Sequence, residues 1–171
     1  MDFEFINQLP GKKILLKGNH DYWWTTLASM RNFLQENNFT NIDFLYNNSY
    51  EYGKYIITGT RGWSVKEEGN EKMLNRENIR LELSLQDAIN QYGNEKEKIV
   101  FMHYPPIMKS DLEQNEETEF IKIMKKYNVK KCFYGHLHSA SIKEAVEGNY
   151  FGIDFKLVSS DALNFKLLKV D

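Results

Sequence analysis

The stretch of sequence that decides the fold is "LLKGNHDYWW", residues 15–24. An apolar run stops at Gly18, and an amide, an imidazole and a carboxylate follow in a row as Asn19, His20 and Asp21. Side chains of these types bind metals, move protons and orient one another. At the end of a predicted strand they form either a turn, in which Gly, Asn and Asp are common, or one wall of an active site.

The composition favours one compact intracellular domain covering residues 1–171. Hydrophobic residues make up 42% of the chain and aromatic residues 14%, which is enough for a packed core. A net charge of −2 gives no signal for nucleic-acid or membrane partners. The lone Cys132 cannot form an internal disulfide, and the chain has neither a long apolar run nor a signal-peptide pattern. We therefore expect a cytoplasmic protein.

Hydrophobic periodicity predicts strands and helices in a mixed order. Helices are expected where apolar residues recur every three to four positions, over residues 3–9, 25–38, 70–92 and 116–127. Strands are expected at 12–18, 42–47, 53–63, 98–103, 130–136, 149–159 and 164–170. Strands and helices alternate in the first part, and strands dominate the end. The fold class predicted is α/β, with mixed sheets and helices outside them.

The four histidines of the chain all follow apolar, strand-like runs. His20 follows "ILLKGN", His103 follows "IVFM", and His136 and His138 follow "CFYG". Ligands of α/β sheets bind beyond the carboxyl ends of strands. Three strands therefore bring every imidazole of the protein toward what could be a single site.

The spacing of these residues adds a second constraint. His136 and His138 are two residues apart, so they point to the same side if the backbone is extended. Gly135 is expected to let the backbone bend or approach a ligand closely, and the prolines after His103 end its strand. Neutral imidazoles in such a place are common ligands of Zn, Mn or Fe. Each motif alone is a weak signal, but the combination favours a metal site.

The motifs together resemble a known family. "GNHD" at 18–21, a histidine at a strand end before prolines, and "GHLH" at 135–138 resemble the later motifs of the calcineurin-like metallophosphoesterases. "GTRGW" at 59–63 and "VSSDALNF" at 158–165 are similar to a bacterial subgroup of that family. The resemblance implies a four-layer α-β-β-α sandwich with two metal ions between the motif loops.

The resemblance also implies roles for individual residues. Asn19, His103 and His136 would be ligands of one divalent ion (Mn, Fe or Zn), and His138 a ligand of a second. His20 would be the general acid beside the phosphate, with Asp21 orienting it. Two ions about 3.5–4 Å apart would lower the pKa of a bridging water, whose hydroxide attacks the phosphorus atom. The function implied is metal-dependent hydrolysis of a phosphoester, as in a manganese phosphatase.

Two motifs of the family are missing from this sequence. The family begins with an Asp-x-His motif and a Gly-Asp motif, and neither string occurs here. We expect the C-terminal part of the domain, a sandwich incomplete at the N-terminus: a fragment, a gene that has lost its first strands, or one half of a split protein. The chain alone should then bind one metal ion or none and have impaired activity. The alternative is a catalytically silent, metal-binding remnant that acts through a partner chain.

The same reasoning predicts an unpaired edge on the strand at 12–18. Such an edge favours self-association, or pairing with the missing N-terminal segment.

The remaining charged residues carry weaker signals. Arg61 in "GTRGW" could contact a substrate phosphate or pair with a neighbouring glutamate. The aspartates without a motif are interpreted as solvated or turn residues: Asp43, Asp87, Asp111, Asp154 and Asp161.

Overall fold

The computed structural model describes residues 2–64, 70–114 and 116–170. Its strands are β1 (Lys13–Leu15), β2 (Ile42–Phe44), β3 (Tyr50–Tyr52), β4 (Tyr55–Thr60), β5 (Glu97–Met102), β6 (Lys131–Tyr134), β7 (Gly148–Tyr150) and β8 (Ile153–Leu157). Its helices are α1 (Asp2–Gln8), α2 (Leu27–Glu36), α3 (Glu71–Tyr92), α4 (Lys109–Glu113), α5 (Glu119–Lys126) and the 3₁₀ helix η1 (Ser139–Glu144). No helix within the described ranges is long and apolar enough to cross a membrane.

The larger sheet has six strands in the order β3-β4-β5-β6-β8-β7. The four inner strands run parallel, and β3 and β7 pair antiparallel at the two edges. The inner strands β4, β5 and β6 are apolar runs, which is typical of parallel strands covered on both faces. Their carboxyl ends lie at one edge of the sheet, where ligands of such folds bind.

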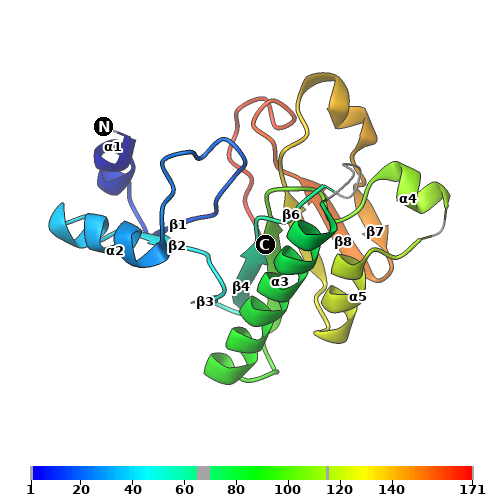
Figure 1. The fold of residues 1–171 in the computed structure, drawn as a ribbon, viewed down its shortest axis with the longest axis horizontal. Helices are drawn as coiled ribbons and strands as arrows, with labels where there is room; N and C mark the ends of the chain where they lie inside the picture. The colour runs from blue at the N-terminus through cyan, green and yellow to red at the C-terminus, as the bar shows by residue number, and fades with distance from the viewer. Residues whose placement is uncertain (1, 65–69, 115, 171) are drawn as a thin grey trace.

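Helices α3 and α5 cover one face of this sheet (Figure 1). Leu81 and Leu85 of α3 and Ile121 of α5 are fully buried against Val100 and Cys132 of the strands. Burial of each such side chain stabilises the fold by about 1.5–3 kcal/mol. This core fixes the directions of β5 and β6, and with them the positions of the loops that follow.

The smaller sheet pairs β1 with β2 in parallel and packs against α2. Met30 and Leu34 of α2 pack with Ile42 and Phe44 of β2, and the side chain of Thr26 caps the helix. Each sheet therefore carries its own helices, which confirms the mixed α/β fold. Among the described strands β2 is the only partner of β1, so the other edge of β1 is unpaired, as predicted.

Three of the predicted strands take a different form in the structure, and β3, α4 and η1 were not predicted. The predicted strand at 164–170 is irregular, and Phe165 and Leu167 there are exposed. The predicted strand at 149–159 is the hairpin β7–β8, which turns at Phe151 and Gly152 where both residues have positive φ. The strand expected at 12–18 is paired only over β1, because β2 is equally short. A strand pattern becomes a strand only where a neighbour supplies hydrogen bonds.

Candidate metal centre and its surroundings

Three strand ends carry the residues of the candidate site. The loop with Asn19 follows β1, His103 follows β5 directly, and His136 comes two residues after β6. Strands β5 and β6 are parallel neighbours, so their carboxyl ends deliver the two histidines side by side. Asn19 reaches them from the smaller sheet.

The side chains of Asn19, His103 and His136 converge on one point. The Oδ1 atom of Asn19 lies 2.7 Å from Nε2 of His103, and Nδ1 of His136 lies 3.1 Å from the same nitrogen. An imidazole nitrogen carries either one proton or one lone pair, so it cannot satisfy both neighbours. Two ligands bound at right angles to one metal ion, about 2.0–2.2 Å from it, would lie roughly 3 Å apart. These three side chains, called the ligand trio below, match that spacing.

The surroundings of His103 keep its ring neutral. Burial, followed by the nearby His136, lowers the pKa of His103 to about 4. At neutral pH its ring nitrogen is therefore available as an electron-pair donor, which is the form of histidine that binds metals.

The turn around Gly18 allows the loop to approach the His103 ring. A Cβ atom at Gly18 would lie 3.2 Å from Cε1 and Nδ1 of His103 and 3.3 Å from Oδ2 of Asp21. The Gly18 amide donates a 2.6 Å hydrogen bond to that carboxylate oxygen. Glycine at position 18 therefore brings Asn19 within reach of His103.

The contacts of Asp21 differ from the expectation that it orients His20. Its carboxylate accepts hydrogen bonds from the Gly18 amide and from Nε1 of Trp23, and it makes none to His20 within the described part of the chain. The ring of His20 is exposed, with its Nδ1 atom 3.4 Å from the hydroxyl of Tyr22. Asp21 thus stabilises the turn that holds Asn19.

The backbone of the "GHLH" loop bends at His136, whereas the sequence suggested a bend at Gly135. His136 has a φ of 71°, in the left-handed region that a residue with a side chain rarely adopts. Gly135 has no such φ, and a Cβ atom there would meet nothing closer than 3.8 Å. Strain of this kind, of order 1–3 kcal/mol, is found at functional sites, and here it turns the His136 ring toward His103.

Asp161 contacts His138, and sequence reasoning did not predict that contact. Its Oδ1 atom lies 2.8 Å from Nδ1 of His138, and its Oδ2 accepts a 2.8 Å hydrogen bond from the Ser139 amide. These bonds, the one from Ser139 first, hold the pKa of Asp161 below its usual value. A carboxylate on one nitrogen of a histidine orients the other nitrogen for a metal. Asp161 lies in a turn, as the sequence suggested, and its carboxylate also contacts His138.

A comparison with family models matches residues 2–140 to the calcineurin-like phosphoesterase model. The match covers well over half of the chain. The chain belongs to the calcineurin-like phosphoesterase family. Searches of curated proteins and of solved structures found no match.

The donor atoms of this calcineurin-like phosphoesterase suit the divalent metals that the family generally uses. One amide oxygen and two imidazole nitrogens form a mixed O/N set, which fits Mn, Fe or Zn. Within the described ranges no three His, Cys, Asp or Glu side chains gather around one point. The ligand trio contains two such residues, and its third member is an amide.

The other charged residues singled out in the sequence differ in their contacts. Arg61 makes no ion pair with a described carboxylate, and its guanidinium lies 4.4 Å from the centre of the Trp63 ring. Asp43, Asp87 and Asp111 bind nearby side chains or amides, and Asp111 lines a pocket together with His136. Asp154 is exposed on β8.

Proposed function

We propose that this calcineurin-like phosphoesterase hydrolyses a phosphoester with the help of divalent cations. The observation that carries the proposal is the convergence of the ligand trio within 2.7 and 3.1 Å on one ring nitrogen. Asn19, His103 and His136 would hold one cation, and His138, oriented by Asp161, would face a second. When bound, two such cations provide a nucleophilic hydroxide at neutral pH and neutralise the phosphoryl oxygens.

The protein's own residues would position and protonate the substrate. The turn closed by Gly18 and Asp21 holds Asn19 against His103 and exposes the next residue, His20. His20, accessible to a ligand, would donate a proton to the leaving alkoxide, a step that contributes about 10²–10⁴-fold to a rate. The long contact from Tyr22 supports the orientation of its ring, since Asp21 is engaged elsewhere.

The test compares two esters that differ in their need for a proton. Hydrolysis of phenyl phosphate and of 4-nitrophenyl phosphate would be measured with and without Mn²⁺. Turnover should be slow and require Mn²⁺, and His103→Ala should abolish it. His20→Ala should reduce turnover of phenyl phosphate about 10²-fold or more and that of the nitrophenyl ester much less, because nitrophenolate leaves without a proton. Lys122→Gln, on α5, is the control. Equal losses for both esters would contradict the role of His20.

The second candidate is a catalytically silent protein that binds metal and acts through a partner chain. The observation in its favour is that the ligand trio holds no carboxylate, so its hold on a cation would be weak. Calorimetric titration with Mn²⁺ separates the two candidates. Binding that His103→Ala removes, together with no turnover above buffer, would favour the silent protein.

A further inference from the structure

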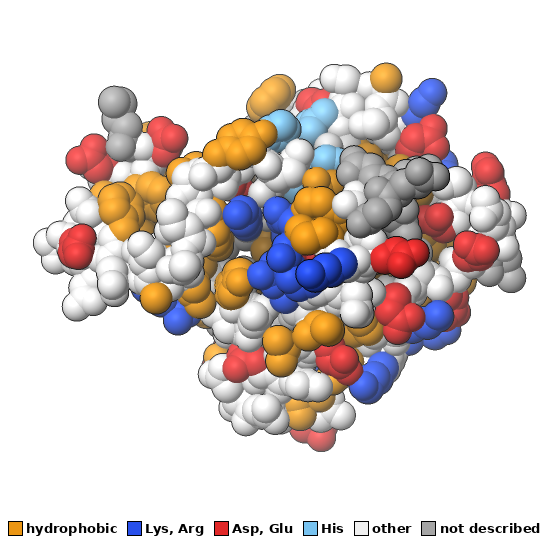
Figure 2. All heavy atoms as spheres, viewed as in Figure 1, with side chains coloured by type: hydrophobic (Ala, Val, Ile, Leu, Met, Phe, Trp, Pro, Cys, Tyr) orange, Lys and Arg blue, Asp and Glu red, His pale blue; other side chains and the backbone are white. Residues whose placement is uncertain are grey.

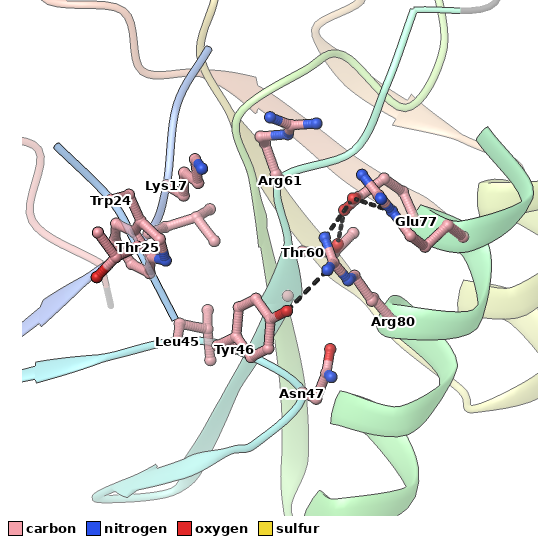
Figure 3. A pocket seen from close by; sticks show the side chains of 13 residues that line it. Lys17, Trp24, Thr25, Leu45, Tyr46, Asn47, Thr60, Arg61, Glu77 and Arg80 are labelled. Atoms are coloured by element: carbon pink, nitrogen blue, oxygen red, sulfur yellow. Dashed lines mark hydrogen bonds and ion pairs between the residues drawn. The ribbon is translucent and has the colours of Figure 1, made fainter. Parts of the chain in front are cut away.

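A pocket of about 180 Å³ opens between the ends of β1, β2 and β4 and the first half of α3. Figure 3 shows Lys17 on one side of it, Arg61 above, and Arg80 with Glu77 on the other. Arg76 also lines it. The volume equals roughly six water molecules, which is enough for a phosphate group. We call it the basic pocket.

The basic pocket has an excess of positive charge. Lys17, Arg61, Arg76 and Arg80 line it together with a single carboxylate, that of Glu77. Figure 2 shows basic side chains gathered around a hollow, with histidine side chains on the same face. One acid against four bases leaves an excess of three positive charges.

Glu77 is already occupied by its neighbours. The buried carboxylate accepts a 2.6 Å hydrogen bond from Thr60 and a 2.6 Å ion-pair contact from Arg80, and Nε of Arg76 lies 3.8 Å away. Arg80 also donates to the hydroxyl of Tyr46 at 2.7 Å. The one acid of the pocket therefore pairs directly with the α3 side, and it acts on Arg61 only at longer range.

Lys17 and Arg61 have no carboxylate at ion-pair distance within the described residues, although Arg61 lies over the Trp63 ring. Neither side chain makes a hydrogen bond or ion pair with any described side chain, and the Nε atom of Arg61 is buried without a hydrogen-bond acceptor. Burial is the main cause that lowers the pKa of each, and other cations of the pocket add to the effect, whereas Asp21 raises the pKa of Lys17 and Glu77 that of Arg61. Cations in this position are costly unless an anion joins them.

The basic pocket adjoins the ligand trio. The carbonyl of Arg61 accepts hydrogen bonds from the amides of His103 and Tyr104, at 3.2 and 2.8 Å. Lys17 lies two residues before Asn19 in the same loop. An anion between Lys17 and Arg61 would therefore be a neighbour of a phosphoryl group bound at the trio.

We propose that the basic pocket binds a second phosphate of the substrate, so that the preferred substrates carry two phosphate groups on one small molecule. This inference rests on the proposed function for the phosphate that is cleaved. The planar fork of Arg61 suits two oxygens of a phosphate, and Lys17 supplies a point charge opposite it.

The test uses two ligands that differ by one phosphate. Propyl phosphate and the bisphosphate of propane-1,3-diol would be titrated into the chain with Mn²⁺ present, alongside inorganic phosphate. The bisphosphate should bind at least about tenfold more tightly than propyl phosphate, given the usual strength of hydrogen bonds to charged groups. Arg61→Gln and Lys17→Gln should each remove most of that difference and leave propyl phosphate almost unchanged. Arg31→Gln and Lys122→Gln, both exposed, are the matched controls.

Three binding results would overturn the inference. They are equal affinity for the two esters, a loss in the controls as large as in Lys17→Gln, and inorganic phosphate binding as tightly as the bisphosphate. Self-association that depends on Lys17, with no phosphate bound, would also overturn it and point to a carboxylate-bearing protein segment. Thermal unfolding of each variant identifies a folding defect, and Arg61→Lys, which keeps the charge, should lose less affinity than Arg61→Gln.

A metal-free titration separates this inference from the proposed function. Without Mn²⁺ the bisphosphate should still bind weakly through the basic pocket. His103→Ala should leave that binding intact, whereas Lys17→Gln should remove it. This pattern, found together with no hydrolysis, would uphold the basic pocket and reject the enzymatic function.

Discussion

Replacing Gly18 with alanine adds one carbon atom where the Asn19 loop meets the His103 ring. The new Cβ would lie 3.2 Å from two ring atoms of His103 and 3.3 Å from Oδ2 of Asp21, closer than nine in ten real Cβ contacts. The backbone at Gly18 is not in the left-handed region, so the effect comes from crowding and not from strain. The ring or the loop must move by a few tenths of an ångström.

A shift of that size is large for a metal site. Distances in such sites hold to within about 0.2 Å, and changes next to a ligand typically cost about 10–100-fold in metal affinity. We expect Gly18→Ala to weaken Mn²⁺ binding about tenfold in calorimetric titration, with little change in the melting temperature, because the loop is at the surface.

Gly135→Ala is the matched control in the other motif loop. A Cβ atom there would meet the His103 carbonyl oxygen at 3.8 Å and Oγ of Ser159 at 3.9 Å, which are ordinary contacts. Metal affinity should be nearly unchanged. The reasoning is refuted if Gly18→Ala binds Mn²⁺ like the parent chain, or if the two variants lose affinity equally.

Three further predictions follow from other contacts. Asp161→Asn should reduce metal affinity by about 10-fold, because His138 loses the carboxylate that orients it. Asp154→Asn, on exposed β8, should leave metal affinity unchanged. A second titration step that Asp161→Asn does not affect would argue against this role of Asp161. Glu77→Ala should lower the free energy of unfolding in urea by about 2–3 kcal/mol, because Arg80 and Thr60 lose a buried partner. A loss of stability no greater than that of the exposed control Glu119→Ala would contradict this prediction. We also propose that the unpaired edge of β1 and the exposed Phe165 and Leu167 cause self-association, so a monodisperse monomer in sedimentation velocity would count against it.

The sequence was informative where chemistry and strand ends coincide. "GNHD", the histidine before the prolines and "GHLH" predicted that Asn19, His103 and His136 come together, and the structure brings them within 2.7 and 3.1 Å. Apolar periodicity predicted α3 almost to its ends, because a long amphipathic pattern has few alternative structures.

The sequence was uninformative where a contact between residues distant in the chain determines the local structure. Asp161 reaches His138 across 23 positions, and nothing local to "SSDAL" marks that contact. The pattern at 164–170 favours a strand, but no described strand pairs with it, and Val170 packs on the face of the larger sheet instead. The bend at His136 also depends on its neighbours, because local preference alone would put the bend at Gly135.

The most direct test of the central claim is an NMR spectrum of the histidine rings during titration with Zn²⁺. The chain has only four histidines, so each ring nitrogen can be assigned. The account predicts that the signals of His103 Nε2 and His136 Nδ1 shift to metal-bound values with the first equivalent, and that His20 is unchanged. A spectrum in which His20 responds while His103 and His136 do not would contradict it.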